Sequence, residues 1–339
     1  MNGKSILVTG GAGYIGSHVC KALAENGYVP VTYDNLSSGN LDAVKWGPLE
    51  RGDIRDVKAL SAAVQTHKPA AIMHFAAKIQ VGDSVVNPAE FYYNNLFGSY
   101  TLLEVARQYG IKHMVFSSTA AVYGMPQTNL IPETAPKAPI NPYGNTKLAM
   151  ENMISDFSSA YNLNFATLRY FNAAGADLQS ETGTAYPVDT HLIPLLMQVA
   201  AGQRPEIGIY GTDYDTPDGT AIRDYIHVTD LAQAHVLALE NIFQNNQNLT
   251  LNLGTNQGYS VREVIKKARE VTGQSIPAAE IPRRAGDPPI LVADATKARE
   301  VLGWQPHHSD IGTILESAWR WKCSQRKGAS AAENQTETA

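Results

Sequence analysis

The sequence predicts an α/β protein of the Rossmann type, a doubly wound parallel sheet with a smaller carboxy-terminal lobe. In the first half, short β-branched or apolar runs alternate with amphipathic stretches of helical length, which is the pattern of βαβ units. A glycine-rich stretch, Gly10 to Gly16, lies between the first such run and the first helical stretch. Beyond about Asn172, loops rich in proline and glycine become frequent, which indicates a second lobe.

Each element of this fold is predicted from its own run of residues. The strands are predicted at 5–9, 29–34, 71–75, 114–118 and 165–169, and the helices between them at about 15–26, 56–67, 88–109 and 143–161. In the second lobe, helices are predicted near 189–202, 228–243, 259–272 and 310–322. Residues 324–339 are polar and lack periodicity, which predicts a disordered tail.

Composition excludes several classes of protein. Apolar residues make up 44% of the 339 and charged residues 17%, as in ordinary globular proteins, and no apolar run reaches the ~18 residues of a membrane-spanning helix. The amino terminus lacks the pattern of a secretory signal, so we expect a cytoplasmic protein without a membrane segment. The net charge of −5 argues against nucleic acid as a partner. Cys20 and Cys323 suggest no disulfide framework, and His74, His113 and His235 lack the spacing of metal ligands.

The glycine-rich loop predicts a site for a dinucleotide. Gly10, Gly13 and Gly16 permit a tight turn and a close approach of the backbone, and the following helix offers free N–H groups to an anion. Asp34 ends the second predicted strand, where a carboxylate accepts hydrogen bonds from the adenine ribose and repels a 2′-phosphate. NAD is therefore the expected cofactor rather than NADP.

Asp53 and Ile54 would lie at the end of one more strand, between the strand at 29–34 and the helix at about 56–67. There a carboxylate would lie beside the adenine ring, although Asp53 taken alone is better explained as a turn-forming aspartate. With these residues, 1–175 are predicted to form the NAD-binding domain and 176–323 mainly the substrate-binding lobe, with some segments of the lobe returning to the sheet.

A tyrosine and a lysine predict the chemistry of the site. Tyr143 and Lys147 are four residues apart, so both lie on one face at the start of a helix. A free tyrosine, with a pKa near ~10, is a poor base at neutral pH, but a nearby cation favours its phenolate. Ser117, Ser118 and Thr119 end a predicted strand and would bring hydroxyl groups to the same cleft. Tyr143 is therefore a candidate general base.

Together, the glycine loop, the Ser-Ser-Thr strand end and the Tyr-x-x-x-Lys helix resemble the extended short-chain dehydrogenase family. The resemblance runs from about Ser5 to Trp321. Within that family, five blocks are most similar to the enzymes that invert a hydroxyl of a nucleotide-linked sugar. These blocks are Gly10 to His18, His74 to Ala77, Tyr92 to Asn95, Leu168 to Gly175 and Arg223 to Val228.

The resemblance implies an isomerase of galactose metabolism, in which UDP-galactose and UDP-glucose interconvert through a 4-keto sugar and a tightly held NAD. It also implies a homodimer that associates through the helices near 88–109 and 143–161. Tyr143 would be the base and Lys147 its electrostatic partner. Thr119, or its neighbour Ser118, would be the hydroxyl that bridges substrate and tyrosine.

The resemblance assigns the other site residues to two groups. The implied cofactor contacts are Gly10, Gly13, Tyr14, Ile15, Gly16, Asp34, Asn35, Asp53, Ile54, Phe75, Ala76, Ala77, Asn94, Ser117, Tyr143, Lys147 and Tyr170. The implied substrate contacts are Thr119, Tyr143, Asn172, His191, Arg223, Arg284 and Asp287, of which the two arginines suit a diphosphate. Tyr170 fits a core position equally well, and His191 fits a capping or packed histidine.

The chain departs from some relatives at two further positions. Lys78 stands one place before the position of a nicotinamide-side lysine, which is Ile79 here. Leu291 aligns with a residue that sets the space around the sugar. A residue smaller than tyrosine leaves room for an N-acetyl group, so UDP-N-acetylhexosamines are further expected substrates.

Two alternative functions share this fold. A nucleotide-sugar 4,6-dehydratase usually carries Asp-Glu after the threonine, whereas Thr119 is followed here by Ala120 and Ala121. A dinucleotide-binding sensor without catalysis needs no base beside the nicotinamide, whereas Tyr143 and Lys147 are both present.

Overall fold

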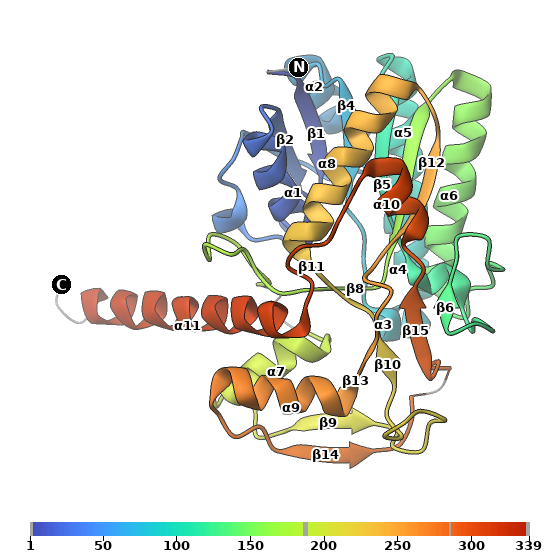
Figure 1. Cartoon of the computed structure of the whole chain (residues 1–339). Helices are drawn as coiled ribbons and strands as arrows, with labels where there is room; N and C mark the ends of the chain where they lie inside the picture. Colours follow the sequence, from blue (N-terminus) through green and yellow to red (C-terminus); the bar gives the residue numbers. More distant parts are fainter. Residues whose placement is uncertain (1–2, 186–188, 285, 337–339) are drawn as a thin grey trace.

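Seven strands form the central sheet, and every adjacent pair in it is parallel (Figure 1). The computed structural model describes residues 3–185, 189–284 and 286–336, with side chains as far as Gln325. The chain order reverses between β1 and β4, so the crevice beyond the carboxyl ends of these strands is the expected ligand site. In spatial order the strands are β12 (Leu249–Leu253), β7 (Asn164–Tyr170), β5 (His113–Thr119), β4 (Ala71–His74), β1 (Ser5–Thr9), β2 (Val29–Asp34) and β3 (Leu49–Arg51).

Helices cover both faces of the sheet because successive strand residues point to opposite sides. Ile6 and Val8 of β1 pack in the cluster that contains α1 (Tyr14–Glu25) and α8 (Val228–Asn245). Leu7, between them, packs on the other side in the cluster that contains α2, α5 and α6. These helices span Val57–His67, Gly98–Gln108 and Pro142–Tyr161, respectively.

The predicted helix 88–109 is three consecutive helical segments. α4 (Pro88–Phe91) leads into a π-helical stretch, η2 (Tyr92–Phe97), which continues as α5. The short helix α3 (Val81–Val86) precedes them. Two 3₁₀ turns, η1 (Leu41–Ala43) and η3 (Ala120–Tyr123), follow β2 and β5.

The second lobe is built from helices and short strand pairs. Its core contains buried residues of α7 (Leu192–Ala200), α9 (Val261–Thr272) and the first half of α11 (Ile311–Thr336). Figure 1 shows the pair β9 and β14 below these helices. The strands of the lobe and its links to the sheet are β6 (Leu130–Ile131), β8 (Asn172–Ala174), β9 (Ile207–Tyr210), β10 (Ile222–Arg223), β11 (Tyr225–His227), β13 (Tyr259–Ser260), β14 (Ala278–Ile281) and β15 (Ile290–Ala293).

Three segments of the second half return to the sheet. β12 pairs with β7 and extends the sheet, α8 packs against α1, and α10 (Thr296–Leu302) contacts β12. The residues after 175 therefore do not all belong to the lobe. α7 and β9 do, whereas β12, α8 and α10 pack with the sheet and its helices. Within the described parts of the chain, no helix is long and apolar enough to cross a lipid bilayer.

The end of the chain differs from the sequence prediction. α11 continues through Thr336, across residues that we expected to be a disordered tail (Figure 1). The stretch after Cys323 contains no proline and one glycine, and its alanine, glutamate, glutamine and lysine residues favour helix even without an apolar stripe. Absence of periodicity was therefore a poor guide to its backbone conformation.

Candidate active site

A cavity of about 1850 Å³ lies between the carboxyl ends of the sheet strands and the second lobe. The described lining contains most of the residues predicted for the site. From the sheet and its helices these are Gly10, Gly13, Tyr14, Ile15, Gly16, Asp34, Asn35, Ile54, Phe75, Ala76, Ala77, Asn94, Ser117, Thr119, Tyr143, Lys147 and Tyr170; from the lobe side they are Asn172, His191, Arg223, Arg284 and Asp287.

The glycine loop requires glycine at its first position. Gly10 has a positive φ of 75°, and a Cβ there would lie 2.6 Å from the backbone nitrogen of Ala76. The segment that follows β4 therefore passes too close for any side chain at this position. Gly13 is the N-cap residue of α1 and has no side chain to cap it, so the amino end of the helix is left to bind an anion.

Asp34 ends β2 inside the cavity. One carboxylate oxygen accepts a hydrogen bond from the backbone N–H of Ala12 at 3.0 Å, and the other accepts one from Leu36 at 2.8 Å. Burial raises the pKa of this carboxyl group, and the two backbone hydrogen bonds act in the opposite direction. The bonds hold the carboxylate against the glycine loop, where it fits the hydroxyl groups of an adenine ribose.

Asp53 lies outside the lining of the cavity, in contrast to its neighbour Ile54. Its carboxylate accepts hydrogen bonds from the guanidinium of Arg55 at 2.7 and 2.8 Å and from the amide of Asn35 at 2.9 Å. Hydrogen bonding to Arg55 is the main reason that its pKa is lowered to about 2. The Asp53 carboxylate is thus bonded to two side chains of this chain, whereas Asn35 and Ile54 line the cavity.

Tyr143, Lys147 and Thr119 meet where α6 begins beside the end of β5. The side chain of Asn141 caps α6 by accepting a hydrogen bond from Gly144 N–H at 2.8 Å. Burial raises the pKa of Tyr143 to about 12, and hydrogen bonding to Thr119 lowers it in part. Lys147 is almost fully buried and donates to the carbonyl oxygen of Ser117 at 2.8 Å. Tyr143 and Lys147 therefore both reach the cavity wall at this point.

Burial also shifts the pKa of Lys147. It lowers the pKa of the ammonium group to about 7, while the carboxylate of Glu151 raises it. A buried lysine next to a tyrosine is a common arrangement for acid–base chemistry.

Ser118 faces away from the cavity, so its predicted catalytic role is not supported. Alternation along β5 places Ser117 and Thr119 on the cavity side and Ser118 on the opposite side. Its hydroxyl donates to Glu151 Oε1 at 2.6 Å, and that carboxylate also receives two hydrogen bonds from Arg169, at 2.6 and 2.9 Å. Ser118 thus belongs to a buried network behind the site.

The lobe side of the cavity carries Arg204 and the two predicted arginines, Arg223 and Arg284. Arg223 donates to Asp287 Oδ1 at 2.5 Å. The guanidinium of Arg284 stacks 3.9 Å from the centre of the Tyr210 ring. Asn172 lies between the two sides and donates its amide to the carbonyl oxygen of Asp224 at 2.8 Å. Both guanidinium groups line the cavity, which suits an anionic ligand.

The remaining predicted residues also have definite places. His191 is the N-cap residue of α7, half-exposed, with Nδ1 3.2 Å from Asp189 Oδ1. Lys78 pairs with Glu90 at 3.2 Å, and Ile79 lines the cavity beside it. Leu291, on β15, also lines the cavity.

Glu151 and Tyr210 lie at the site but were not predicted from the sequence. Glu151 stands four residues after Lys147, so helical spacing was a usable signal for a shared face. Tyr210 ends a strand of the lobe, and its contact with Arg284 joins segments more than seventy residues apart. No local pattern indicates such a pair.

Comparison with known proteins decides the family. Residues 6–254 match the model of the NAD dependent epimerase/dehydratase family. The chain belongs to this family. Membership confirms the resemblance predicted from the sequence.

Relatives are similar to this chain along almost its whole length. A UDP-glucose 4-epimerase of Rhizobium leguminosarum bv. trifolii is 49% identical over 321 residues, which cover 95% of this chain and 98% of that protein. The crystal structure of a UDP-glucose 4-epimerase from Brucella ovis in complex with NAD has a TM-score of 0.92 and 49% identity, and covers 94% of this chain and 98% of that one.

A third similar protein is named for two sugars. The UDP-Glc/GlcNAc 4-epimerase from Campylobacter jejuni has a TM-score of 0.83 and 41% identity, with 95% of this chain and 99% of that chain covered. The solved neighbours confirm the predicted Rossmann-type fold.

Proposed function

We propose that this protein is an NAD-dependent UDP-glucose 4-epimerase, an isomerase that interconverts UDP-galactose and UDP-glucose. One observation carries the proposal. Tyr143, Thr119 and Lys147 line the same cavity as the glycine loop and the lobe-side pair Arg223 and Arg284. This arrangement supports a dinucleotide on the sheet side and a nucleotide-linked sugar on the lobe side, with the candidate base between them.

The residues of the sheet fit NAD. The glycine loop, which a Cβ at Gly10 would obstruct, would hold the diphosphate, and Asp34 would accept hydrogen bonds from the adenine ribose. Lys147 would contact the nicotinamide ribose. NAD bound there would supply reversible hydride transfer at C4 of the sugar, by way of a 4-keto form.

The proton is handled by the side chains of this chain. Tyr143 takes the proton of the sugar 4-hydroxyl and gives it back when configuration is inverted. Because burial raises the pKa of this tyrosine, its base form would need a compensating positive charge, and we assign that role to the protonated form of Lys147, four residues later on the same helix. Thr119, the hydrogen-bond partner of Tyr143, would bridge the phenol and the substrate hydroxyl.

The lobe side fits the nucleotide diphosphate. Arg223 and Arg284 would bind the phosphate oxygens, and Asp287 would accept hydrogen bonds from the uridine ribose. Asn172 would contact the link between sugar and phosphate. Leu291 leaves space beside the sugar, which supports the N-acetylated UDP-hexosamines as further substrates.

The residues after Thr119 argue against the nearest rival activity. Ala120 and Ala121 enter the 3₁₀ turn η3 at the position where 4,6-dehydratases carry two carboxylates. Elimination of water needs such an acid–base pair, so epimerisation is favoured.

A homodimer is part of the same proposal. The exposed face of η2 and α5 carries the aromatic residues Tyr93, Phe97 and Tyr100, each about half exposed, and the rings of Tyr93 and Phe97 stack at 5.3 Å. Such a face suits a second copy of the chain. Sedimentation analysis would distinguish the dimer from a monomer. The cytoplasmic location and a place in galactose metabolism remain predictions from the sequence.

One incubation tests the proposed activity. The purified protein is mixed with UDP-galactose and, separately, with UDP-N-acetylgalactosamine, without added NAD, and the products are identified by NMR. The proposal expects UDP-glucose from the first substrate. An accumulating 4-keto-6-deoxy sugar would indicate a dehydratase instead, and absence of turnover by a protein that contains NAD would indicate a non-catalytic binder.

A further inference from the structure

A short segment after β8 crosses the helix that follows the glycine loop. We name Gly175–Ala185 the strap. Both of its ends line the cavity, together with Gly13 and Ile15 of the loop and helix. Tyr14, in the first turn of α1, donates its hydroxyl to the carbonyl oxygen of Gly175 at 2.7 Å. The strap therefore forms a wall of the cavity beside the glycine loop.

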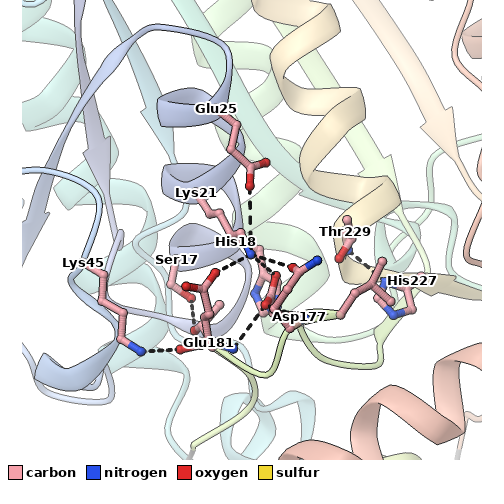
Figure 2. A network of polar contacts seen from close by, with 12 residues as sticks. Ser17, His18, Lys21, Glu25, Lys45, Asp177, Glu181, His227 and Thr229 are labelled. Atoms are coloured by element: carbon pink, nitrogen blue, oxygen red, sulfur yellow. Dashed lines mark hydrogen bonds and ion pairs between the residues drawn. The ribbon is translucent and has the colours of Figure 1, made fainter.

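Three residues on one face of α1 hold the strap: Tyr14, Ser17 and Lys21, at positions i, i+3 and i+7. The hydroxyl of Ser17 lies 2.9 Å from that of Thr182. Figure 2 shows Ser17 and Lys21 directed from α1 toward the strap.

Lys21 makes the densest contact with the strap. Its ammonium group donates to Asp177 Oδ1 at 2.7 Å, Gln179 Oε1 at 2.9 Å and Glu181 Oε2 at 2.6 Å. An ammonium group has three donors, so residues of the strap use all three. Lys21 and Asp177 are both buried, so water competes little for these charge-assisted bonds. We call Lys21, Asp177, Gln179 and Glu181 the latch.

Asp177 also shapes the strap itself. Its second oxygen accepts hydrogen bonds from the backbone N–H groups of Gln179 at 3.0 Å and Glu181 at 3.1 Å, which curl the strap around the carboxylate. One carboxylate thus joins the fold of the strap to its attachment on α1. The described part of α11 supports the strap ends, since Ser317 accepts from Ala176 N–H and Trp321 donates to the carbonyl oxygen of Thr184.

The proposed reaction gives these residues no chemical step. Lys21, Asp177, Gln179 and Glu181 lie outside the cavity lining, whereas the strap ends and the glycine loop lie within it. Separation of the strap from α1 would widen the cavity beside the loop. The proposed epimerase returns its hydride within one catalytic cycle, so it gains from retaining its dinucleotide.

We propose that the latch holds the strap against the phosphate-binding helix and thereby slows the release of NAD. Lys21 is in this view a positioning residue that acts through the strap. The inference rests on the proposed function, because it requires NAD in the cavity.

The test measures NAD release from the purified protein. The rate is followed after addition of an enzyme that destroys free NAD, in the parent and in Lys21→Met, Lys21→Arg and Glu181→Gln. Glu181 is half exposed, so its variant leaves folding intact. Arg262→Met, which breaks an exposed ion pair with Glu280 outside the cavity lining, is the matched control.

We expect release from Lys21→Met to be faster by about tenfold or more, the scale of a lost charge-assisted hydrogen bond. Glu181→Gln should show a smaller increase, and Lys21→Arg should restore most of the retention. Turnover without added NAD should fall in Lys21→Met, and saturating NAD should return kcat to near the parent value. Arg262→Met should release NAD like the parent.

The outcomes separate the latch from the proposed function. If the parent retains NAD and the Lys21 and Glu181 variants release it at the same rate, the latch is refuted while the epimerase proposal stands. A lower melting temperature with unchanged release would likewise mean a merely structural cluster. A parent protein that binds no NAD would refute both.

Discussion

The ammonium group of Lys147 donates a hydrogen bond to the backbone carbonyl oxygen of Ser117 at 2.8 Å. This bond joins the first turns of α6 to the end of β5. The ammonium also lies 5.0 Å from the centre of the Phe116 ring, so it is held in a largely apolar interior. Lys147, four residues after the candidate base, is therefore anchored in a buried position, and burial lowers the pKa of its ammonium group to about 7.

The first prediction concerns stability and pH. The pKa of Lys147 is about 7 in the folded protein, against an ordinary value of 10.5. Between these two pH values the unfolded chain binds more protons than the folded protein, so the free energy of unfolding rises with pH. The free-energy cost of burying the cation is therefore greatest below pH 7. Lys147→Met removes that cost, so its stability relative to the parent should be greater at pH 6 than at pH 9.

The expected difference between the two pH values is of the order of 2 kcal/mol, since one pKa unit corresponds to about 1.4 kcal/mol. Denaturant unfolding at both pH values measures it. Lys267→Met, at an exposed lysine of α9, is the control. An equal effect of Lys147→Met at pH 6 and pH 9 would contradict a lowered pKa.

The second prediction tests the base. Tyr143→Phe removes the phenol and keeps the ring, so folding and NAD content should remain near those of the parent. Epimerase turnover should fall by roughly 10²-fold or more, the scale of a lost general base. Tyr161→Phe, at the exposed end of the same helix, should keep normal turnover. Parent-like turnover in Tyr143→Phe would remove this residue from its assigned role.

The third prediction separates two adjacent hydroxyl groups. Thr119→Val keeps the shape of the side chain but removes the partner of Tyr143, so kcat should fall by about tenfold or more, as expected for a lost hydrogen bond to the reacting group. Ser118→Ala leaves Glu151 without one buried donor, so it should lower the free energy of unfolding by about 1–3 kcal/mol with a smaller effect on kcat. The reverse pattern in steady-state kinetics and denaturant unfolding would show that the cavity hydroxyl had been misassigned.

The same strand shows what the sequence can and cannot predict. The fold follows from local patterns, since the strands, the glycine loop and the Tyr143 helix each have a periodicity or composition of their own. The Ser117 to Thr119 run placed the hydroxyls at the cleft, but which of them faces it depends on the pairing of β5 with β4 and β7. The pairing of Asp53 with Arg55 was not predicted, because no periodicity or composition signal indicates that these two side chains bond to each other.

The strap shows a second limit. Lys21 and Asp177 are more than 150 residues apart in the chain, and the sequence around each of them predicts only an ordinary charged residue at the surface. Only the folded arrangement brings them within 2.7 Å in a buried position. Likewise, the return of β12 to the sheet depends on pairing with β7, which a short apolar run does not specify.

The fourth prediction concerns the cofactor. Asp34→Ala removes the carboxylate proposed for the adenine ribose and two hydrogen bonds from the backbone around the glycine loop. NAD content after gel filtration should fall well below that of the parent, and discrimination against NADP should weaken because the repelling charge is lost. Asp42→Ala, at an exposed aspartate of the next turn, is the control. Parent-like NAD content in Asp34→Ala would argue against the ribose role.

The last prediction concerns the choice of sugar. Leu291 lines the cavity from β15 and packs against a cluster that contains Val122, Tyr123 and Ile131. A tyrosine at this position would project further into the space beside the sugar, because its ring is longer than the leucine side chain and the buried cluster behind it leaves little room for the ring to move back. In Leu291→Tyr, kcat/KM for UDP-N-acetylgalactosamine should therefore fall by about tenfold or more, while that for UDP-galactose changes less, since a steric clash acts only on the larger substituent.

The control for this variant is Leu291→Met, which conserves volume. It should leave the ratio of the two kcat/KM values near that of the parent. If the tyrosine variant lowers both values of kcat/KM equally, residue 291 controls the shape of the whole pocket and not the space for the N-acetyl group.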